Sequence, residues 1–118
     1  MITKEMFEEQ INKICALESG WYDGVQGCTF KKENFENIKY KIYDAYHIGI
    51  PLPHMAPWVD DSEICLEWYN KDECIMRVDL NTSTNMVTFN SIESLEDQEF
   101  NLDTEWSFIE CALWEMLE

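Results

Sequence analysis

Carboxylates are the most abundant chemically active groups of this chain, and they crowd towards its C-terminal end. Residues 78–118 hold 10 Asp and Glu residues and no Lys or Arg, whereas residues 1–50 hold 8 acids and 6 bases. Carboxylates at this density, without counter-charges, can occupy a basic groove in place of phosphates. The alternative is a solvated face that only keeps the protein soluble. We favour the first interpretation, because so many like charges repel one another and destabilise a compact fold.

The predicted partner-binding residues are acids of the C-terminal third, together with one tryptophan. They are Glu93, Glu96, Asp97, Glu99, Asp103, Glu105, Glu110, Trp114 and Glu118. Trp114 lies between Glu110 and Glu118, and a tryptophan ringed by carboxylates suits the anchor of a protein interface. Trp106 is a second candidate anchor. The alternative for Trp114 is ordinary core packing, if this last helix is buried on two sides.

The cysteines and histidines carry no recognisable catalytic or metal-binding pattern. Cys28 with His47 or His54 could supply a nucleophile and a base, but no motif would orient them. There is no C-x-x-C, and the two histidines lack zinc-ligand spacing. The segment that starts at Asp79 imitates a calcium-binding loop but lacks the glycine and the final glutamate of such a loop. We therefore expect no enzyme activity, no metal and no cofactor.

The cysteine count also bears on the cellular compartment. The chain has five cysteines, an odd number, which predicts free thiols in a reducing cytoplasm. Cys65 and Cys74 lie on neighbouring predicted strands, but strict alternation places them on opposite faces and disfavours a disulfide. The N-terminal residues do not form a signal peptide, and no apolar run is long enough to span a membrane. We expect a cytoplasmic protein.

Hydrophobic periodicity predicts the elements that position these residues. Helical spacing covers residues 4–18, with Thr3 as N-cap and Ser19-Gly20 as the stop, then residues 31–47 and 104–117. Alternation predicts strands at 63–69, 73–80 and 86–92, and a short fourth strand at 55–59. The predicted fold is a single α+β domain, residues 1–118. It comprises an antiparallel meander of three to four strands and about three helices, in the order α-α-β-β-β-(β)-α.

One aromatic stripe on the second predicted helix allows two interpretations. Tyr40, Tyr43 and His47 recur at i, i+3 and i+7 beside the apolar stripe. They could contact a partner by stacking on its arginines. Alternatively, they pack under a neighbouring loop such as Trp21-Tyr22.

A set of short motifs spans about residues 20–80. In order, they are Trp21-Tyr-Asp-Gly24, Pro51-x-Pro53, Asp60-Asp61 and Ile64-Cys-Leu-Glu-Trp68. This arrangement resembles a group of small bacterial proteins with W-x-D-G, P-x-P and D-G-x-I-x-L-E-W. The group has no established activity, so the resemblance implies a shared fold and a bacterial or phage origin. The chain departs from it at Asp61-Ser62, where a glycine-containing turn is usual, and residues 93–118 lie outside it.

The net charge narrows the class of partner. The formal charge of −16 equals that of roughly 27 Å of DNA duplex, which excludes nucleic acid and anionic membranes as default partners. A basic protein, such as a nucleic-acid-binding effector or a nuclease, is expected instead. By composition alone the chain is similar to anti-CRISPR, antitoxin and immunity proteins. The leading hypothesis is an anti-CRISPR-like phage inhibitor; the alternatives are an antitoxin or immunity protein and a structural adaptor, and homo-oligomerisation stays open.

Overall fold

The computed structural model describes residues 2–59, 63–91 and 98–117. The elements are α1 (Lys4–Cys15), the 3-10 turn η1 (Lys32–Phe35), α2 (Glu36–His47), β1 (His54–Pro57), β2 (Glu63–Asn70), β3 (Glu73–Asn81), β4 (Met86–Ser91), β5 (Gln98–Asn101) and α3 (Leu102–Met116). The strands form one antiparallel sheet of five, in which each strand pairs with the next along the chain. The predicted α+β class is confirmed, with five strands where three to four were expected.

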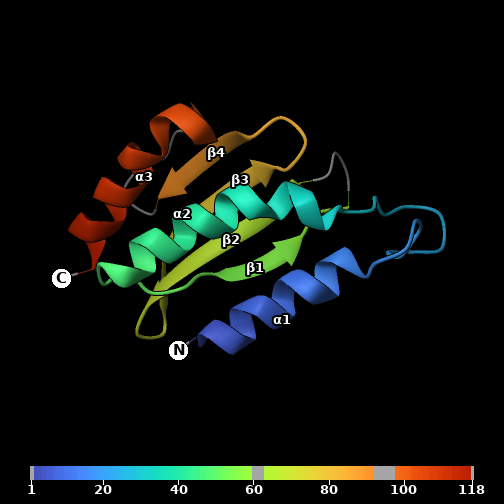
Figure 1. The fold of residues 1–118 in the computed structure, drawn as a ribbon, viewed down its shortest axis with the longest axis horizontal. Helices are drawn as coiled ribbons and strands as arrows, with labels where there is room; N and C mark the ends of the chain where they lie inside the picture. Colours follow the sequence, from blue (N-terminus) through green and yellow to red (C-terminus); the bar gives the residue numbers. More distant parts are fainter. Residues whose placement is uncertain (1, 60–62, 92–97, 118) are drawn as a thin grey trace.

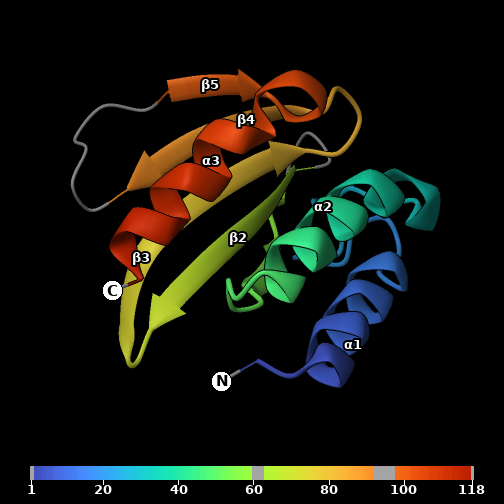
Figure 2. The ribbon, with the colours of Figure 1, turned by 60° about the vertical axis from the view of Figure 1, so that its left-hand side comes forward.

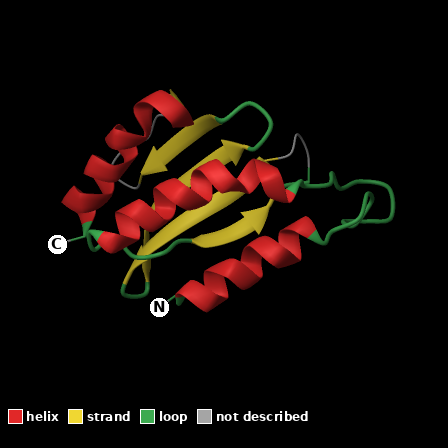
Figure 3. Ribbon diagram, in the orientation of Figure 1, coloured by secondary structure: helices red, strands yellow, loops and turns green. Residues whose placement is uncertain are grey.

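The three helices lie on one side of the sheet (Figures 1 and 3). In Figure 2, α3 lies over the β3–β4 part of the sheet, whereas α1 and α2 lie towards the β1 edge. The core fills the space between the helices and the sheet. Its inward sheet residues pair in register as Ile64 with Leu80, Leu66 with Val78, and Trp68 with Met76, and all six are buried.

The other side of the sheet has no described helix over it, and we call it the open face. One row of side chains runs across it through Ala56, Cys65, Asp79, Thr88 and Glu99. A second row contains His54, Glu67 and Arg77. Alternation along each strand separates these side chains from the core, as an antiparallel sheet with one solvated face requires.

Helix α1 begins as predicted but ends early. The Thr3 hydroxyl accepts the backbone N–H of Met6 at 3.1 Å, which makes Thr3 the N-cap. The apolar stripe of Phe7, Ile11 and Ile14 is buried. The helix ends at Cys15, not at residue 18. The second predicted helix likewise divides into η1 and α2.

The loop after α1 explains the Trp-x-Asp-Gly motif in structural terms. The Asp23 carboxylate accepts the backbone N–H groups of Gln26 and Val25, and these bonds lower the pKa of Asp23. The Trp21 indole N–H donates to the Cys28 carbonyl at 2.7 Å and its ring lies against Gly27. The motif residues thus hold the shape of this loop.

A β-bulge in the β2–β3 hairpin corrects the predicted orientation of Cys74. Trp68 pairs with Met76 but Tyr69 pairs with Cys74, so Ile75 is an extra residue in β3. Ile75 is buried in the core, whereas the Cys74 thiol lies 3.7 Å from Glu67 on the open face. The sequence predicted the reverse, because alternation cannot reveal an inserted residue. All five cysteines are free, as expected.

The C-terminal boundaries also differ from prediction. The sequence predicts no strand between residue 92 and the helix at 104, but Gln98–Asn101 pairs with β4 as strand β5. Helix α3 begins at Leu102, two residues before the predicted start at 104, and its N-cap is Asn101. Phe100 is the only apolar residue of β5, which is too few to show alternation.

The β1 edge of the sheet is closed to further strand pairing. The Trp58 N–H donates to the Glu63 carbonyl at 2.9 Å, so the backbone nitrogens that face away from β2 belong to Pro53, Met55 and Pro57. Proline has no N–H, and the Met55 N–H donates to the Gln10 side-chain oxygen at 2.7 Å. Two prolines and one side chain from α1 therefore leave no free donor on this edge.

Replacing Gln10 with methionine tests this edge. Methionine has a similar shape and helix propensity but no acceptor oxygen, so Gln10→Met leaves the Met55 N–H unpaired. We expect a loss of about 1 kcal/mol in the free energy of unfolding, measured by urea denaturation. Gln10→Glu, which keeps an acceptor oxygen, is the control. Equal stability of the methionine variant and the wild type would contradict the assignment.

A polar contact joins α1 to α2. The Tyr43 hydroxyl donates to the Glu8 carboxylate, which also pairs with Lys39 at 3.2 Å, and the Tyr43 ring packs edge-on against Phe7. Tyr43 therefore packs on α1 and not under the Trp21 loop, while Tyr40 stays exposed. The hydrogen bond from Tyr43 is the main cause that lowers the pKa of Glu8.

This contact predicts a pH-dependent stability difference. Because the folded-state pKa of Glu8 is lowered, its contribution is present above the ordinary pKa of 4.5 and is lost as the pH falls through the lower folded value. Glu8 is 38% exposed, so Tyr43→Phe should cost only about 1 kcal/mol at pH 7, and less towards pH 3. Tyr40→Phe is the control for denaturant melts. A cost that does not change with pH would refute the linkage.

Candidate functional site

The start of α3 uses one of the predicted site residues for capping. The Asn101 side chain accepts the backbone N–H of Asp103 at 2.9 Å. The Glu105 carboxylate accepts the backbone N–H of Asn101 at 3.1 Å. These two bonds satisfy donors that a helix start leaves unpaired, and the carboxylate also favours the positive end of the helix dipole. Glu105 is thus held against the backbone.

Trp106 is a core residue, so its prediction as an interface anchor is wrong. It is 7% exposed, and its ring lies 6.4 Å from that of Trp68. Its indole N–H donates to the Glu110 carboxylate at 3.1 Å. Glu110, a predicted site residue, therefore satisfies a buried donor at the margin of the core.

Two further predicted residues lie where α3 meets α2. Asp103 accepts a hydrogen bond from the Asn37 side chain. Trp114 lies against Gly49, where an added Cβ would come within 3.2 Å of the indole ring. Trp114 is still 45% exposed. Trp114 is therefore neither a core residue nor an isolated anchor, because part of its ring packs against Gly49, just after α2.

The outward side of α3 combines aromatic rings with acids. We call the exposed residues Asp103, Phe108, Trp114 and Glu115 the α3 surface. Phe108 is 62% exposed and stacks on Phe100 of β5 at 5.8 Å. Sequence reasoning missed Phe108, although its place off the buried stripe is visible from helical periodicity.

The α3 surface has no cationic counterpart within the described part of the chain. The ion pairs Lys39–Glu8 and Arg77–Asp79 lie elsewhere. The last turn of α3 contains no basic residue, although a helix C-terminus favours cations. Glu115 lies in that turn, so its charge opposes the dipole. Glu115 therefore persists at a local cost in stability, which favours a role outside the fold for this residue.

The predicted cluster of acids is not one surface. Glu99 lies on the open face in the row of Asp79 and Thr88, because its neighbour Phe100 packs towards the core. Asp103, Glu105, Glu110 and Trp114 belong to α3 in the other layer. Glu93, Glu96, Asp97 and Glu118 lie outside the described residues. The chain passes between the two layers at β5, where the open face and the α3 surface meet.

The open face carries an aromatic and arginine cluster that sequence reasoning missed. The Trp58 indole N–H donates to the Asp79 carboxylate at 2.8 Å, and the Arg77 guanidinium lies 4.9 Å from the Trp58 ring centre. Arg77 Nε lies 3.7 Å from the same carboxylate. Arg77 and Asp79 alternate with the buried residues of β3 and therefore point outward.

The thiols of the open face are not activated for chemistry. Burial raises the pKa of Cys65 to about 12, and burial is also the main cause that raises the pKa of Cys74. A nucleophilic thiol needs the opposite shift. The Cys28 thiol donates to the Trp58 carbonyl at 3.9 Å, which is a structural contact. Within the described ranges, no group of three His, Cys, Asp or Glu side chains could hold a metal ion.

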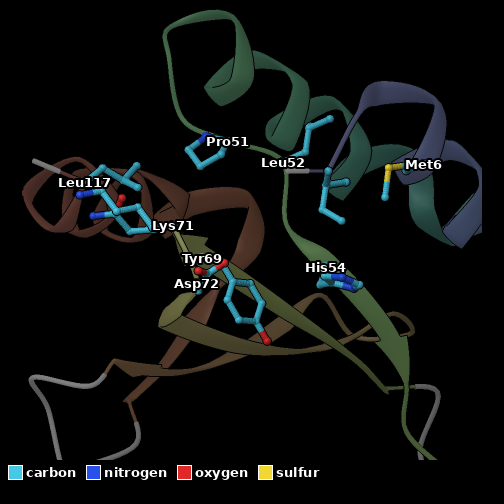
Figure 4. A pocket seen from close by; sticks show the side chains of 10 residues that line it. Met6, Pro51, Leu52, His54, Tyr69, Lys71, Asp72 and Leu117 are labelled. Atoms are coloured by element: carbon cyan, nitrogen blue, oxygen red, sulfur yellow. The ribbon is translucent and has the colours of Figure 1, made fainter.

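A pocket of about 670 Å³ opens between the start of α1, the Pro51–His54 connector, the β2–β3 hairpin and the end of α3 (Figure 4). Its apolar walls include Met6, Leu52 and Leu117. Lys71 and Asp72 supply one charge of each sign on the hairpin. The volume suits a small molecule. The lining selects neither an anion nor a cation, so the pocket does not indicate a reaction.

Comparisons with protein-family models, curated proteins and solved structures found no match. The resemblance of residues 20–80 to the small bacterial proteins therefore stays a prediction. Among the described helices, none has the length and apolarity to cross a bilayer. Function must be argued from the surfaces themselves.

A matched pair of glycine substitutions tests the support of Trp114. Gly49 (φ +112°) and Gly24 (φ +89°) both adopt backbone conformations that disfavour side chains, but a Cβ at Gly24 meets nothing within 4 Å. Each alanine variant should lose roughly 1–2 kcal/mol from backbone strain. Gly49→Ala should also displace the Trp114 ring, seen as a shifted indole N–H resonance. An unchanged Trp114 resonance in Gly49→Ala would contradict this contact.

Proposed function

We propose that this protein is a small, non-enzymatic acidic inhibitor that binds and blocks the basic nucleic-acid-binding surface of another protein. The observation that carries the proposal is the α3 surface, where Asp103 and Glu115, without a cationic partner among the described residues, share a helix with exposed Phe108 and Trp114. An anti-CRISPR-like phage counter-defence protein acting in the bacterial cytoplasm is the most concrete form. An antitoxin or immunity protein that neutralises a basic nuclease would use the same contacts.

The mechanism is competition by charge and by volume. Lysine and arginine side chains that normally grip phosphates would pair with Asp103, Glu115 and the neighbouring acids, which releases the counterions of both partners. The exposed rings would supply apolar area that phosphates cannot offer, and so hold the complex in one register. Occupation by a folded domain then excludes the nucleic acid.

The structure sorts the predicted site residues by what each could contribute. Asp103 and Trp114 are exposed on α3, and Glu99 is exposed on β5. Glu105 and Glu110 accept hydrogen bonds within the protein and are therefore less free to contact a partner directly. Glu93, Glu96, Asp97 and Glu118 remain part of the proposal through the sequence alone.

Replacing Glu115 with lysine separates binding from stability. The new cation favours the helix dipole, so Glu115→Lys should raise the free energy of unfolding by about 0.5 kcal/mol. The same change should lower the affinity for a basic partner several-fold and reduce the salt dependence of binding. Calorimetric melting and titration of the partner at several salt concentrations measure the two effects.

The partner for this experiment is a host protein that the immobilised inhibitor retains and that heparin, a nucleic-acid mimic, releases. Glu9→Lys on exposed α1 is the matched control, because it changes the net charge equally and should leave affinity near that of the wild type. Equal weakening by both variants would show that only net charge matters. Absence of any heparin-released partner would overturn the proposed function.

A further inference from the structure

The open face carries the residue types that dominate protein interfaces. Trp58 is 39% exposed, Tyr69 is 37% exposed, and the Arg77 side chain is 45% exposed. Trp, Tyr and Arg are the residues most enriched at binding hot spots. Arg77 is also the single arginine of the chain. These residues lie on the sheet layer of the fold and not on the α3 surface.

The Trp58 ring is held in place before any partner arrives. Its indole N–H bonds Asp79 at 2.8 Å, Arg77 lies over its ring, and its backbone N–H bonds the Glu63 carbonyl at 2.9 Å. A side chain fixed in this way loses little conformational entropy on binding. The ring is therefore suited to act as a rigid anchor.

The charges around this ring select the occupant. Glu67, Asp79 and Glu99 lie on the open face with Arg77 as their described counter-charge, which leaves an excess of carboxylates. A second copy of the chain, also at −16, would be repelled, and so would a nucleic acid. The complementary occupant is a protein segment that carries lysine and arginine.

We infer that the open face is a docking surface for a basic protein segment, with Trp58 as its anchor. The inference rests on the proposed function and adds a contact face to it. Because β5 separates the open face from the α3 surface, a basic groove that straddles this edge of the sheet contacts both layers at once. The partner would then grip the β5 edge instead of lying flat on α3.

A nona-arginine peptide is the probe, because it tests the face without knowledge of the natural partner. Fully extended it spans about 30 Å, so it covers one face of the protein at a time. In a titration of isotope-labelled protein at low salt, we expect the largest NMR shifts at the Trp58 indole N–H and at the amides of Arg77 and Thr88. Largest shifts at Ser107, Cys111 and Trp114 would overturn the inference.

Two lysine substitutions of equal charge provide the matched test. Thr88→Lys lies between Asp79 and Glu99 on the open face, and Ser107→Lys lies on the exposed side of α3. We expect Thr88→Lys to lower the affinity for the peptide about tenfold, and Ser107→Lys to lower it by no more than about twofold. The reverse order would overturn the inference while leaving a basic partner on α3 intact.

Trp58→Phe guards against a misfolded lysine variant. It keeps an aromatic ring but loses the hydrogen bond to Asp79, so we expect a threefold to fivefold weaker peptide with an unchanged circular dichroism spectrum. Unchanged affinity would count against Trp58 as the anchor. A failed search for a heparin-released host partner would instead refute the proposed function, whatever the peptide does.

Discussion

The burial of one apolar face of a five-stranded sheet is the constraint on which the rest of this structure depends. Ile64, Leu66 and Trp68 face their β3 partners under three helices, and this face takes almost every large apolar residue of the strands. The burial of this face takes precedence over polar pairing, since the Trp68 indole N–H is buried without a hydrogen-bond partner in the described structure. An unpaired buried donor costs about 1–3 kcal/mol, which the surrounding apolar burial must offset.

Once that face is fixed, the polar residues divide between two separate layers. Side chains that alternate away from the core form the open face, and the outward side of α3 forms the other surface. Acids that look like one cluster in the sequence therefore point in different directions. In the proposed function, the negative charge attracts a basic partner over a long range, and the exposed aromatic residues determine where that partner makes contact.

The sequence predicted most of the elements because their signals are local. Thr3 caps α1, the alternation of β2 and β3 is visible, and the loop residue Lys71 adopts the positive φ that a tight turn needs. Some errors came from features without a local signal. Ile75 is an inserted residue that reverses Cys74, and β5 is too short and too polar to show a period. The error over Trp106 had a local signal, because helical spacing places Trp106 on the apolar stripe with Ile109 and Leu113 and about 80° from Trp114.

The candidate site was less predictable than the fold, because a site depends on which elements meet. Nothing in one strand shows that Trp58 reaches Asp79, two strands away, or that Glu99 belongs to the open face. Likewise, the capping bond that occupies Glu105 depends on where α3 begins. The sequence positions of the acids were therefore not enough to predict which of them share a surface.

The closed edge at β1 has a consequence for assembly. Since Pro53, Pro57 and the Gln10–Met55 bond remove every donor there, the sheet can be extended only beyond β5. Two molecules that join through β5 would form a closed two-fold pair with no free end for a third. Any strand pairing between molecules would therefore end at a pair, because the described strands leave no second open edge from which a fibre could grow.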